Sequence, residues 1–375
     1  MFKSFLVVPP GIEQIAIQEL KRLFPHLQPT SDPSGLEFDC DLETIYRLNL
    51  LLRVPNRILV RFAEFEAYSF KDLFSTAVRL PWKQYLKKNS IIQIRTSCHK
   101  SKLYHSDAVT QRLHQAIEAN LGGKITIAKN IDDEQPVNYQ LIIARLNHDR
   151  LTISFDSSGS PLYMRGYREI LTKAPIRENL AASIILASGW TPQFPFIDPF
   201  CGSGTIPIEA ALIQNNIPPG YYRDFAFKKW PGFKEEIWQS IRHEFLSKKE
   251  LEPLKIYGFD RDKGAIEVSR QNAEKARVGS LIEWGKQPIS SLIPFEQPGW
   301  IITNPPYGIR ISENKDIRNL YAQFGKILKN RFSGWKIVFL CSSKILANQT
   351  ELNLKSLHSF SNGGIEVQAF YSKID

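Results

Sequence analysis

Hydrophobic and polar positions follow different periods in the two halves of this chain. In the first half, short alternating segments are separated by segments with helical spacing, a pattern typical of an α+β region. Strands are expected at 5–8, 36–38, 58–67 and 91–96, and helices at 12–23, 42–54, 70–80 and 106–121. We expect Ser106 or Asp107 to cap the last helix and Gly122 to end it. Two more apolar runs, 141–144 and 151–155, predict a hairpin.

The second half alternates apolar strands with helices, which predicts an α/β domain with a mostly parallel sheet. A helix is expected at 178–186, and strands at 196–198, 255–260, 300–303, 337–340 and 365–371, the last of them antiparallel. The segment 157–161, with the sequence Ser-Ser-Gly-Ser-Pro, is the best linker candidate between the halves.

Asn304-Pro305-Pro306-Tyr307 directly follows the expected strand at 300–303. Two prolines cannot continue a strand, so the turn lies at its carboxyl edge, where open α/β sheets bind ligands. The Asn304 side-chain oxygen and the Pro305 carbonyl can accept both N–H bonds of a planar exocyclic amine while Tyr307 stacks on its ring. These four residues are the catalytic candidates. The alternative is a proline-terminated strand and turn without a ligand.

A glycine-rich turn, 198–205, separates another expected strand from a helix. Its spacing differs from the dinucleotide fingerprint and from the phosphate-binding P-loop, and Asp198 would repel a phosphate. An acid at a strand end suits a cationic ligand, such as the ammonium and sulfonium groups of S-adenosylmethionine, and the glycines let backbone N–H groups approach it. The cofactor-binding candidates in this turn are Asp198, Phe200, Cys201, Gly202, Ser203, Gly204 and Thr205.

Asp260 ends the expected strand at 255–260, and Asp262 is expected to cap the helix that follows. An acid at the end of the second strand of such a unit binds ribose hydroxyls, with the neighbouring Arg261 as a second candidate. The alternative is that Asp260 is only a helix-entry residue.

The charge distribution favours a polyanionic partner. The 375-residue chain has a net charge of +10 and a pI near 9.3. No Asp or Glu interrupts one basic stretch, which consists of Arg79, Lys83, Lys87, Lys88, Arg95, Lys100 and Lys102 with the aromatic residues Trp82, Tyr85 and Tyr104 between them. The segment 215–252, here called the long connection, also mixes aromatic and basic residues. It either contacts unstacked RNA bases or packs on its own domain.

The cysteine pattern argues against a zinc protein, and the hydropathy argues against a membrane protein. The 4 cysteines are scattered, without a CxxC pair or a His cluster, which argues against a zinc site and fits reduced thiols. No apolar run reaches membrane-spanning length, so we expect a cytoplasmic protein with no membrane partner.

These motifs, together with 162–168 (Leu-Tyr-Met-Arg-Gly-Tyr-Arg), resemble the THUMP-containing RNA guanine-N2 methyltransferases over nearly the whole chain. The resemblance implies a ferredoxin-like module at 1–43, a THUMP RNA-binding domain at 44–157 and a Rossmann-like class I methyltransferase domain at 158–375. It implies S-adenosylmethionine as cofactor and no metal.

Further site residues follow from this resemblance. Glu178 either faces the methionine part of the cofactor or is an acid in the first turn of its helix that interacts favourably with the helix dipole. Gln287 or a backbone group replaces the Asp that commonly follows the third strand and holds adenine, and Met164 stands where the family often has His. The RNA-binding candidates are Arg95, Lys100 and Lys102, which match the THUMP pattern, and Arg165 and Arg168.

The resemblance implies methyl transfer to the exocyclic N2 amine of a guanine in RNA, with large-subunit ribosomal RNA as the first expectation. The target base must be looped out or flipped to reach such a site. A guanine-N2 enzyme for transfer RNA and an adenine-N6 enzyme are alternatives. A third is a non-catalytic RNA-binding assembly factor with a methyltransferase fold.

Overall fold

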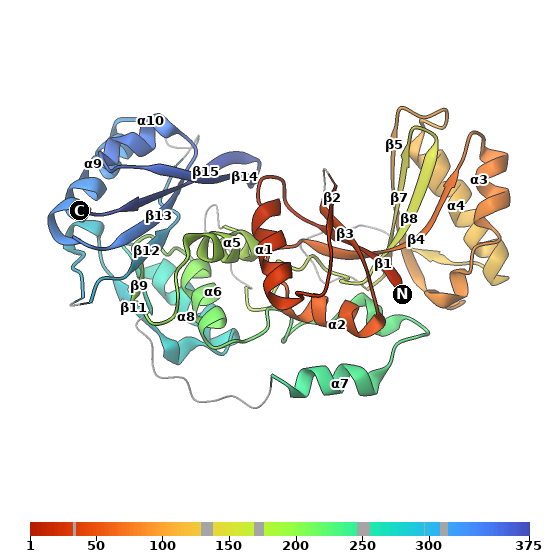
Figure 1. Cartoon of the computed structure of the whole chain (residues 1–375), viewed down its shortest axis with the longest axis horizontal. Helices are drawn as coiled ribbons and strands as arrows, with labels where there is room; N and C mark the ends of the chain where they lie inside the picture. Colours follow the sequence, from red (N-terminus) through yellow and green to blue (C-terminus); the bar gives the residue numbers. More distant parts are fainter. Residues whose placement is uncertain (33–34, 129–137, 169–175, 246–255, 296, 308–313) are drawn as a thin grey trace. The chain divides into compact units, whose positions relative to one another are not determined.

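The computed structural model of the chain describes residues 1–32, 35–128, 138–168, 176–245, 256–295, 297–307 and 314–375, which form two compact units (Figure 1). The N-terminal unit comprises Met1–Val8, Leu20–Leu162 and Arg223–Glu244, and the C-terminal unit comprises Pro9–Glu19, Tyr163–Tyr222 and Phe245–Asp375. The predicted strand start at 255 and the last part of the long connection, 246–252, lie outside the described residues.

The N-terminal unit is built on an eight-stranded sheet with the order β2-β3-β1-β4-β8-β7-β5-β6. Its strands are β1 (Phe2–Val7), β2 (Thr30–Asp32), β3 (Gly35–Cys40), β4 (Arg57–Glu66), β5 (Ile91–His99), β6 (Thr126–Ile127), β7 (Gln140–Asn147) and β8 (Arg150–Asp156). One end of β4 pairs with β1 and most of its length pairs with β8, both antiparallel. The ferredoxin-like and THUMP parts expected from the sequence therefore share one sheet.

The helices in the first half of the sequence are α1 (Glu13–Leu23), α2 (Leu42–Leu51), α3 (Phe70–Ala77) and α4 (Ser106–Leu121). The side chains of Asp41 and Ser69 cap α2 and α3. The predicted cap of α4 at Ser106 or Asp107 is wrong, because His105 is the cap residue and makes no side-chain bond. Gly122 ends α4 with a φ of +69°, as predicted. The predicted β7–β8 hairpin is confirmed.

Residues 157–161 close the N-terminal unit and do not form an exposed linker. Ser157 and Ser158 are fully buried. Asn49 of α2 donates to Ser157 Oγ at 2.8 Å, and its side-chain oxygen accepts from Ser158 Oγ at 2.8 Å. Composition alone predicted exposure here, but these hydrogen bonds satisfy the buried hydroxyls.

The aromatic residues of the long connection pack inside the N-terminal unit. Phe227 stacks on Tyr46 of α2 with ring centroids 4.5 Å apart, and Trp238 of α7 (Glu235–His243) lies 5.3 Å from Phe227. Trp230 donates from Nε1 to Gln140 Oε1 at 2.8 Å. Both expectations, RNA stacking and packing on the connection's own domain, are wrong for these buried rings, because their apolar partners are supplied by the N-terminal unit.

The C-terminal unit contains a seven-stranded sheet with the order β11-β10-β9-β12-β13-β15-β14. Its strands are β9 (Phe196–Asp198), β10 (Ile256–Asp260), β11 (Ile282–Lys286), β12 (Trp300–Thr303), β13 (Lys336–Cys341), β14 (Lys355–Asn362) and β15 (Ile365–Lys373). The pairs among β9 to β13 are parallel, whereas β15 is antiparallel to β13 and β14. The predicted Rossmann-like α/β class and the antiparallel last strand are confirmed, while β14 was not predicted.

Helices cover both faces of this sheet. They are α5 (Glu178–Ser188), α6 (Thr205–Gln214), α8 (Lys263–Lys275), α9 (Asn314–Arg331) and α10 (Lys344–Ala347). In Figure 1, α5, α6 and α8 lie on one side of the strands and α9 and α10 on the other. Burial on both faces explains why the strands are continuous apolar runs.

We predict that Trp238→Ala strongly destabilises the N-terminal unit. Trp238 is 3% exposed and belongs to the aromatic cluster around Tyr46 and Phe227, and removing a buried Trp costs about 3–5 kcal/mol. Ser240→Ala, an exposed change on the same helix, should alter stability by less than about 0.5 kcal/mol. Denaturant unfolding of both variants measures this. Equal stabilities would mean that α7 does not pack on this unit.

Candidate active site

Three neighbouring strand ends bring the predicted site residues together. In the sheet of the C-terminal unit, β9 lies between β10 and β12 and runs parallel to both. Asp198 ends β9, Asp260 ends β10, and Asn304 follows β12. Because parallel strands end at the same sheet edge, these residues converge at the edge where open α/β sheets bind ligands.

Asp198 is a buried acid with an unusual protonation behaviour. It is 1% exposed and accepts hydrogen bonds from the Phe200 backbone N–H at 3.1 Å and from the Thr303 hydroxyl at 2.5 Å. Burial raises the pKa of its carboxyl to about 7, although both hydrogen bonds act in the opposite direction. A cation bound at this edge would favour the ionised form.

The glycine-rich turn is held from two sides. Gly202 donates its N–H to Asp260 Oδ2 at 3.0 Å, so the second acid supports the turn. From α8, Ser269 donates to the Gly202 carbonyl at 2.8 Å and Asn272 to the Ser203 carbonyl at 3.0 Å. Asp262 caps α8 as predicted, by accepting from the Gly264 N–H. Sequence reasoning missed Ser269 and Asn272, because no local signal connects a helix to a turn so distant along the chain.

Trp284 of β11 explains why two glycines are needed here. A Cβ on Gly204, which has a φ of +81°, would lie 2.7 Å from the Trp284 ring. A Cβ on Gly258 of β10 would lie 2.3 Å from the same ring. The indole therefore fills the space over both glycines, and this role was not predicted.

The other cofactor candidates differ in burial and in the contacts of their side chains. The Phe200 ring packs edge-on against Phe324 at 5.4 Å, on the side of the apolar core. Cys201 is 7% exposed, and burial raises the pKa of its thiol well above its usual value, so it remains neutral. Arg261 is exposed. Gln287 donates from Nε2 to the Ser291 carbonyl at 2.8 Å.

The Asn304-Pro305-Pro306-Tyr307 turn carries an open acceptor. Asn304 Oδ1 is buried and has no hydrogen-bond partner among the residues that the structure describes. Tyr307 is half-buried, and its hydroxyl accepts from Asn362 Nδ2 at 3.0 Å. Pro305 is buried and Pro306 exposed. A buried amide oxygen normally has a donor, so Asn304 fits a ligand that supplies N–H groups.

Arg165 and Arg168 lie inside the C-terminal unit. Arg165 is 3% exposed and lies 3.5 Å from Glu209. Arg168 Nε lies 3.4 Å from Glu178 Oε1, and Arg168 Nη2 donates to the Thr205 hydroxyl at 2.7 Å. This burial argues against the RNA contacts expected for both arginines. Their charge fitted RNA, but their carboxylate partners are too distant in sequence to be foreseen.

Glu178 combines a buried charge with an open oxygen. It is 3% exposed, and burial raises the pKa of its carboxyl, with Arg168 as the main opposing influence. Its Oε2 is buried and makes no hydrogen bond within the described part of the chain. This oxygen can accept from an ammonium group, such as that of a methionine moiety.

Three family models match successive parts of the chain. The RlmL ferredoxin-like domain matches residues 3–59, the THUMP domain matches 67–156, and the RMKL-like methyltransferase domain matches 165–367. The chain belongs to this methyltransferase family. Its methyl donor is S-adenosylmethionine. The predicted boundary at 43/44 falls inside the ferredoxin-like match and stays a prediction.

Several relatives resemble the whole chain. It is 32% identical to the "Putative RNA methyltransferase slr0064" of Synechocystis, over 96% of this chain and 94% of that protein. It is 33% identical to a "Ribosomal RNA large subunit methyltransferase K/L" of Syntrophotalea carbinolica over 97% of this chain, but spans only 52% of that relative. The crystal structure of SMU.472, "a putative methyltransferase complexed with SAH", matches with a TM-score of 0.87 and 30% identity, over 100% of this chain and 98% of that one.

In the N-terminal unit, Lys100 and Lys102 lie exposed in the loop between β5 and α4. Lys100 has a φ of +46°, and Lys102 Nζ lies 4.8 Å from the centroid of the Tyr68 ring. The Lys102 N–H donates to Asp149 Oδ1 at 2.6 Å, which ties the loop to the β7–β8 turn. Arg95 of β5 is half-buried. The two lysines are thus held on a fixed surface loop.

Two aromatic residues of the basic stretch belong to the core and not to this surface. Trp82 is fully buried and Tyr85 is 7% exposed, and both pack near Phe155. Tyr104 is 71% exposed. Only Tyr104, of the three interleaved aromatics, can reach a ligand outside the protein.

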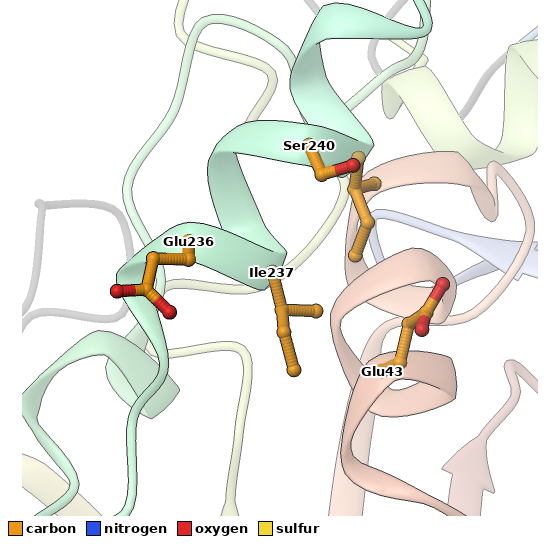
Figure 2. A pocket seen from close by; sticks show the side chains of 5 residues that line it. Glu43, Glu236, Ile237 and Ser240 are labelled. Atoms are coloured by element: carbon orange, nitrogen blue, oxygen red, sulfur yellow. The ribbon is translucent and has the colours of Figure 1, made fainter.

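A cavity of about 270 Å³ lies between α2 and α7 of the N-terminal unit. Figure 2 shows Glu43 from α2 with Glu236, Ile237 and Ser240 from α7 around it. Its two carboxylates make it unsuitable for RNA phosphates.

The described residues form no disulfide, no cluster suited to a metal and no helix suited to span a membrane. All four cysteines, Cys40, Cys98, Cys201 and Cys341, are free. The described residues contain no cluster of three His, Cys, Asp or Glu side chains suited to a metal. None of the described helices combines the length and apolar character needed to cross a membrane.

We predict that Asp198→Asn changes the pH dependence of stability in the cofactor-free protein. Between about pH 4 and pH 7 the folded wild type holds a proton that the unfolded chain releases, so its stability falls as pH rises through this range and levels off above pH 7. The Asn variant lacks this contribution. Its stability relative to wild type should rise from pH 5 to pH 8 in denaturant unfolding. A constant difference would contradict the raised pKa.

Proposed function

We propose that this RNA methyltransferase transfers a methyl group to the exocyclic N2 amine of a guanine in large-subunit ribosomal RNA. The observation that carries the proposal is Asn304 Oδ1, a buried acceptor without a described partner. Asn304 directly follows β12, the strand beside β9, which leads into the glycine-rich turn. An amine with two N–H bonds satisfies that oxygen and the Pro305 carbonyl together. The Syntrophotalea carbinolica relative is named a ribosomal RNA large subunit methyltransferase, which supports the choice of ribosomal RNA.

The residues of the chain act mainly by orientation. Guanine N2 is a weak nucleophile because its lone pair is delocalised into the ring. Asn304 and Pro305 hold the amine so that this lone pair faces the methyl group, and their oxygens stabilise the positive charge that develops on nitrogen. Tyr307 stacks on the base. When bound, S-adenosylmethionine supplies the electrophilic methyl on a sulfonium, and one amine proton is released to solvent.

Cofactor binding is assigned to the neighbouring strand ends. Asp198 and Glu178 offer negative charge to the cationic methionine part, and Asp260 or Arg261 binds the ribose. The backbone of the turn from Phe200 to Thr205 lines the cofactor site. The Trp284 ring packs directly on Gly204, which leaves no room for a side chain at that position of the turn. Gln287 or a nearby backbone group contacts adenine.

RNA recognition is assigned to the THUMP part, with Lys100, Lys102 and Arg95 on the phosphate backbone. Arg165 and Arg168 instead brace the cofactor site through Glu209, Glu178 and Thr205. We propose a limit between the ferredoxin-like and THUMP parts at 43/44, and a cytoplasmic location, where the RNA substrate is found.

Asn304→Ala should reduce the methyl-transfer rate by on the order of a hundredfold or more, because it removes an orienting acceptor. Donor affinity should change little, since the amide contacts the target amine. The measurement is transfer of labelled methyl groups to undermethylated ribosomal RNA, with calorimetry of donor binding. Asn330→Ala, an exposed Asn change on α9, is the control. Near-normal turnover of folded Asn304→Ala would remove the catalytic assignment. A methylated adenine in the product would favour the adenine-N6 alternative.

Lys100→Ala combined with Lys102→Ala should weaken RNA binding and flatten its salt dependence by nearly one unit of log–log slope per lost phosphate contact. Donor affinity should stay unchanged. Lys87→Ala with Lys88→Ala makes the same charge change at exposed positions of the same unit. RNA affinity at several salt concentrations compares the two pairs. Equal effects of both pairs would show a general charge effect and no contact by the β5–α4 loop.

A further inference from the structure

The hydroxyl of Tyr307 is held by a residue near the end of the chain. Asn362 donates from Nδ2 to this hydroxyl at 3.0 Å, and its side chain is buried, with 7% of the residue exposed. Asn362 is the last residue of β14, a strand that carries none of the residues assigned so far to the reaction. A buried donor aimed at a residue of the amine-binding turn needs an explanation beyond packing.

The hairpin around Asn362 fixes its position. Asn362 pairs with Ile365 across a two-residue turn, Gly363-Gly364, whose φ values are +59° and +82°. Positive φ at both turn positions matches the twist of a tight hairpin and favours glycine. On the other edge of β14, Gly11 approaches so closely that a Cβ there would lie 1.8 Å from the Ser359 carbonyl oxygen. The strand therefore cannot shift easily, and neither can the Asn362 amide.

Tyr307 belongs to the same short turn as Asn304, whose Oδ1 is the open acceptor described above. Only Pro305 and Pro306 separate the two residues, and their fixed φ angles limit independent movement within the turn. Holding the Tyr307 hydroxyl therefore also restrains the turn that carries Asn304.

We propose that Asn362 is a positioning residue for methyl transfer, which holds the Tyr307 hydroxyl and thereby the turn that presents Asn304 to the target amine. This inference rests on the proposed function of Asn304. Asn362 touches neither the donor nor the base. It acts by fixing the Tyr307 ring for stacking on the base and by limiting movement of the turn.

A double-mutant cycle separates this role from simple support of the hairpin. The variants are Asn362→Ala, Tyr307→Phe and the pair, assayed for single-turnover methyl transfer to undermethylated large-subunit ribosomal RNA. Each single change should slow transfer about tenfold, the typical effect of losing one hydrogen bond. The pair should be no slower than Tyr307→Phe alone, because Asn362 acts through the hydroxyl that Phe lacks.

Asn362→Leu tests the hydrogen bond directly. It keeps the approximate size of the side chain but has neither a donor nor an acceptor for the Tyr307 hydroxyl, so it should be as slow as Asn362→Ala. Donor affinity and thermal unfolding should match wild type within twofold and about two degrees. Ser361→Ala, an exposed change on the same strand, is the matched control and should be silent.

The outcomes separate the inference from the function on which it rests. The positioning role would be overturned if the two single effects multiplied in the double variant, or if Asn362→Leu had a wild-type rate; either result would leave Asn304 catalytic. A fully active Asn304→Ala, measured in the same assay, would instead overturn the proposed function.

Discussion

A buried hydrogen bond between Thr303 and Asp198 joins the ends of two neighbouring parallel strands, and the rest of the site depends on it. Asn304 follows Thr303 directly, and Asp198 opens the glycine-rich turn, so this bond sets the amine-binding turn against the cofactor turn. In-line methyl transfer requires such alignment, because misplacing the reacting atoms by about 1 Å costs on the order of a hundredfold in rate. Burial disfavours the ionised form of the Asp198 carboxyl, which raises its pKa to about 7. A cationic ligand would stabilise the ionised carboxylate, so the raised pKa of the free protein is consistent with a cationic cofactor at this site.

Four residues of the C-terminal unit with buried polar atoms bear on the proposed site. Arg165 and Arg168 have carboxylate partners, which compensate much of their desolvation. Asn304 Oδ1 and Glu178 Oε2 remain without hydrogen-bond partners in the described chain, one beside the proposed target and the other beside the proposed cofactor. Unpaired buried acceptors cost stability, and natural proteins keep them mainly where a ligand completes them. These two oxygens lie at positions that the motifs assign to the target amine and to the cofactor, so a ligand at each position would satisfy them.

Much of the site follows from local sequence, because parallel strand ends converge whatever the details of packing. Asp198, Asp260 and Asn304 each end or follow an apolar run, so their meeting at one edge was predictable. Contacts across long separations were not. The partners of Arg165 and Arg168, the cover of Trp284 over two glycines and the aromatic packing of the long connection depend on tertiary structure. β14 was missed even though Gly363-Gly364 is a hairpin signal, and with it the contact to Tyr307 was missed.

The central claim is that the chain modifies guanine N2 in large-subunit ribosomal RNA. The most direct test is mass mapping of modified nucleosides in ribosomal and transfer RNA from a strain without this gene, complemented by the wild type or by Asn304→Ala. We predict that one N2-methylguanosine disappears from large-subunit ribosomal RNA and returns only with the wild type. Loss of a methylated adenine, loss confined to transfer RNA, or full restoration by the Asn304 variant would contradict it.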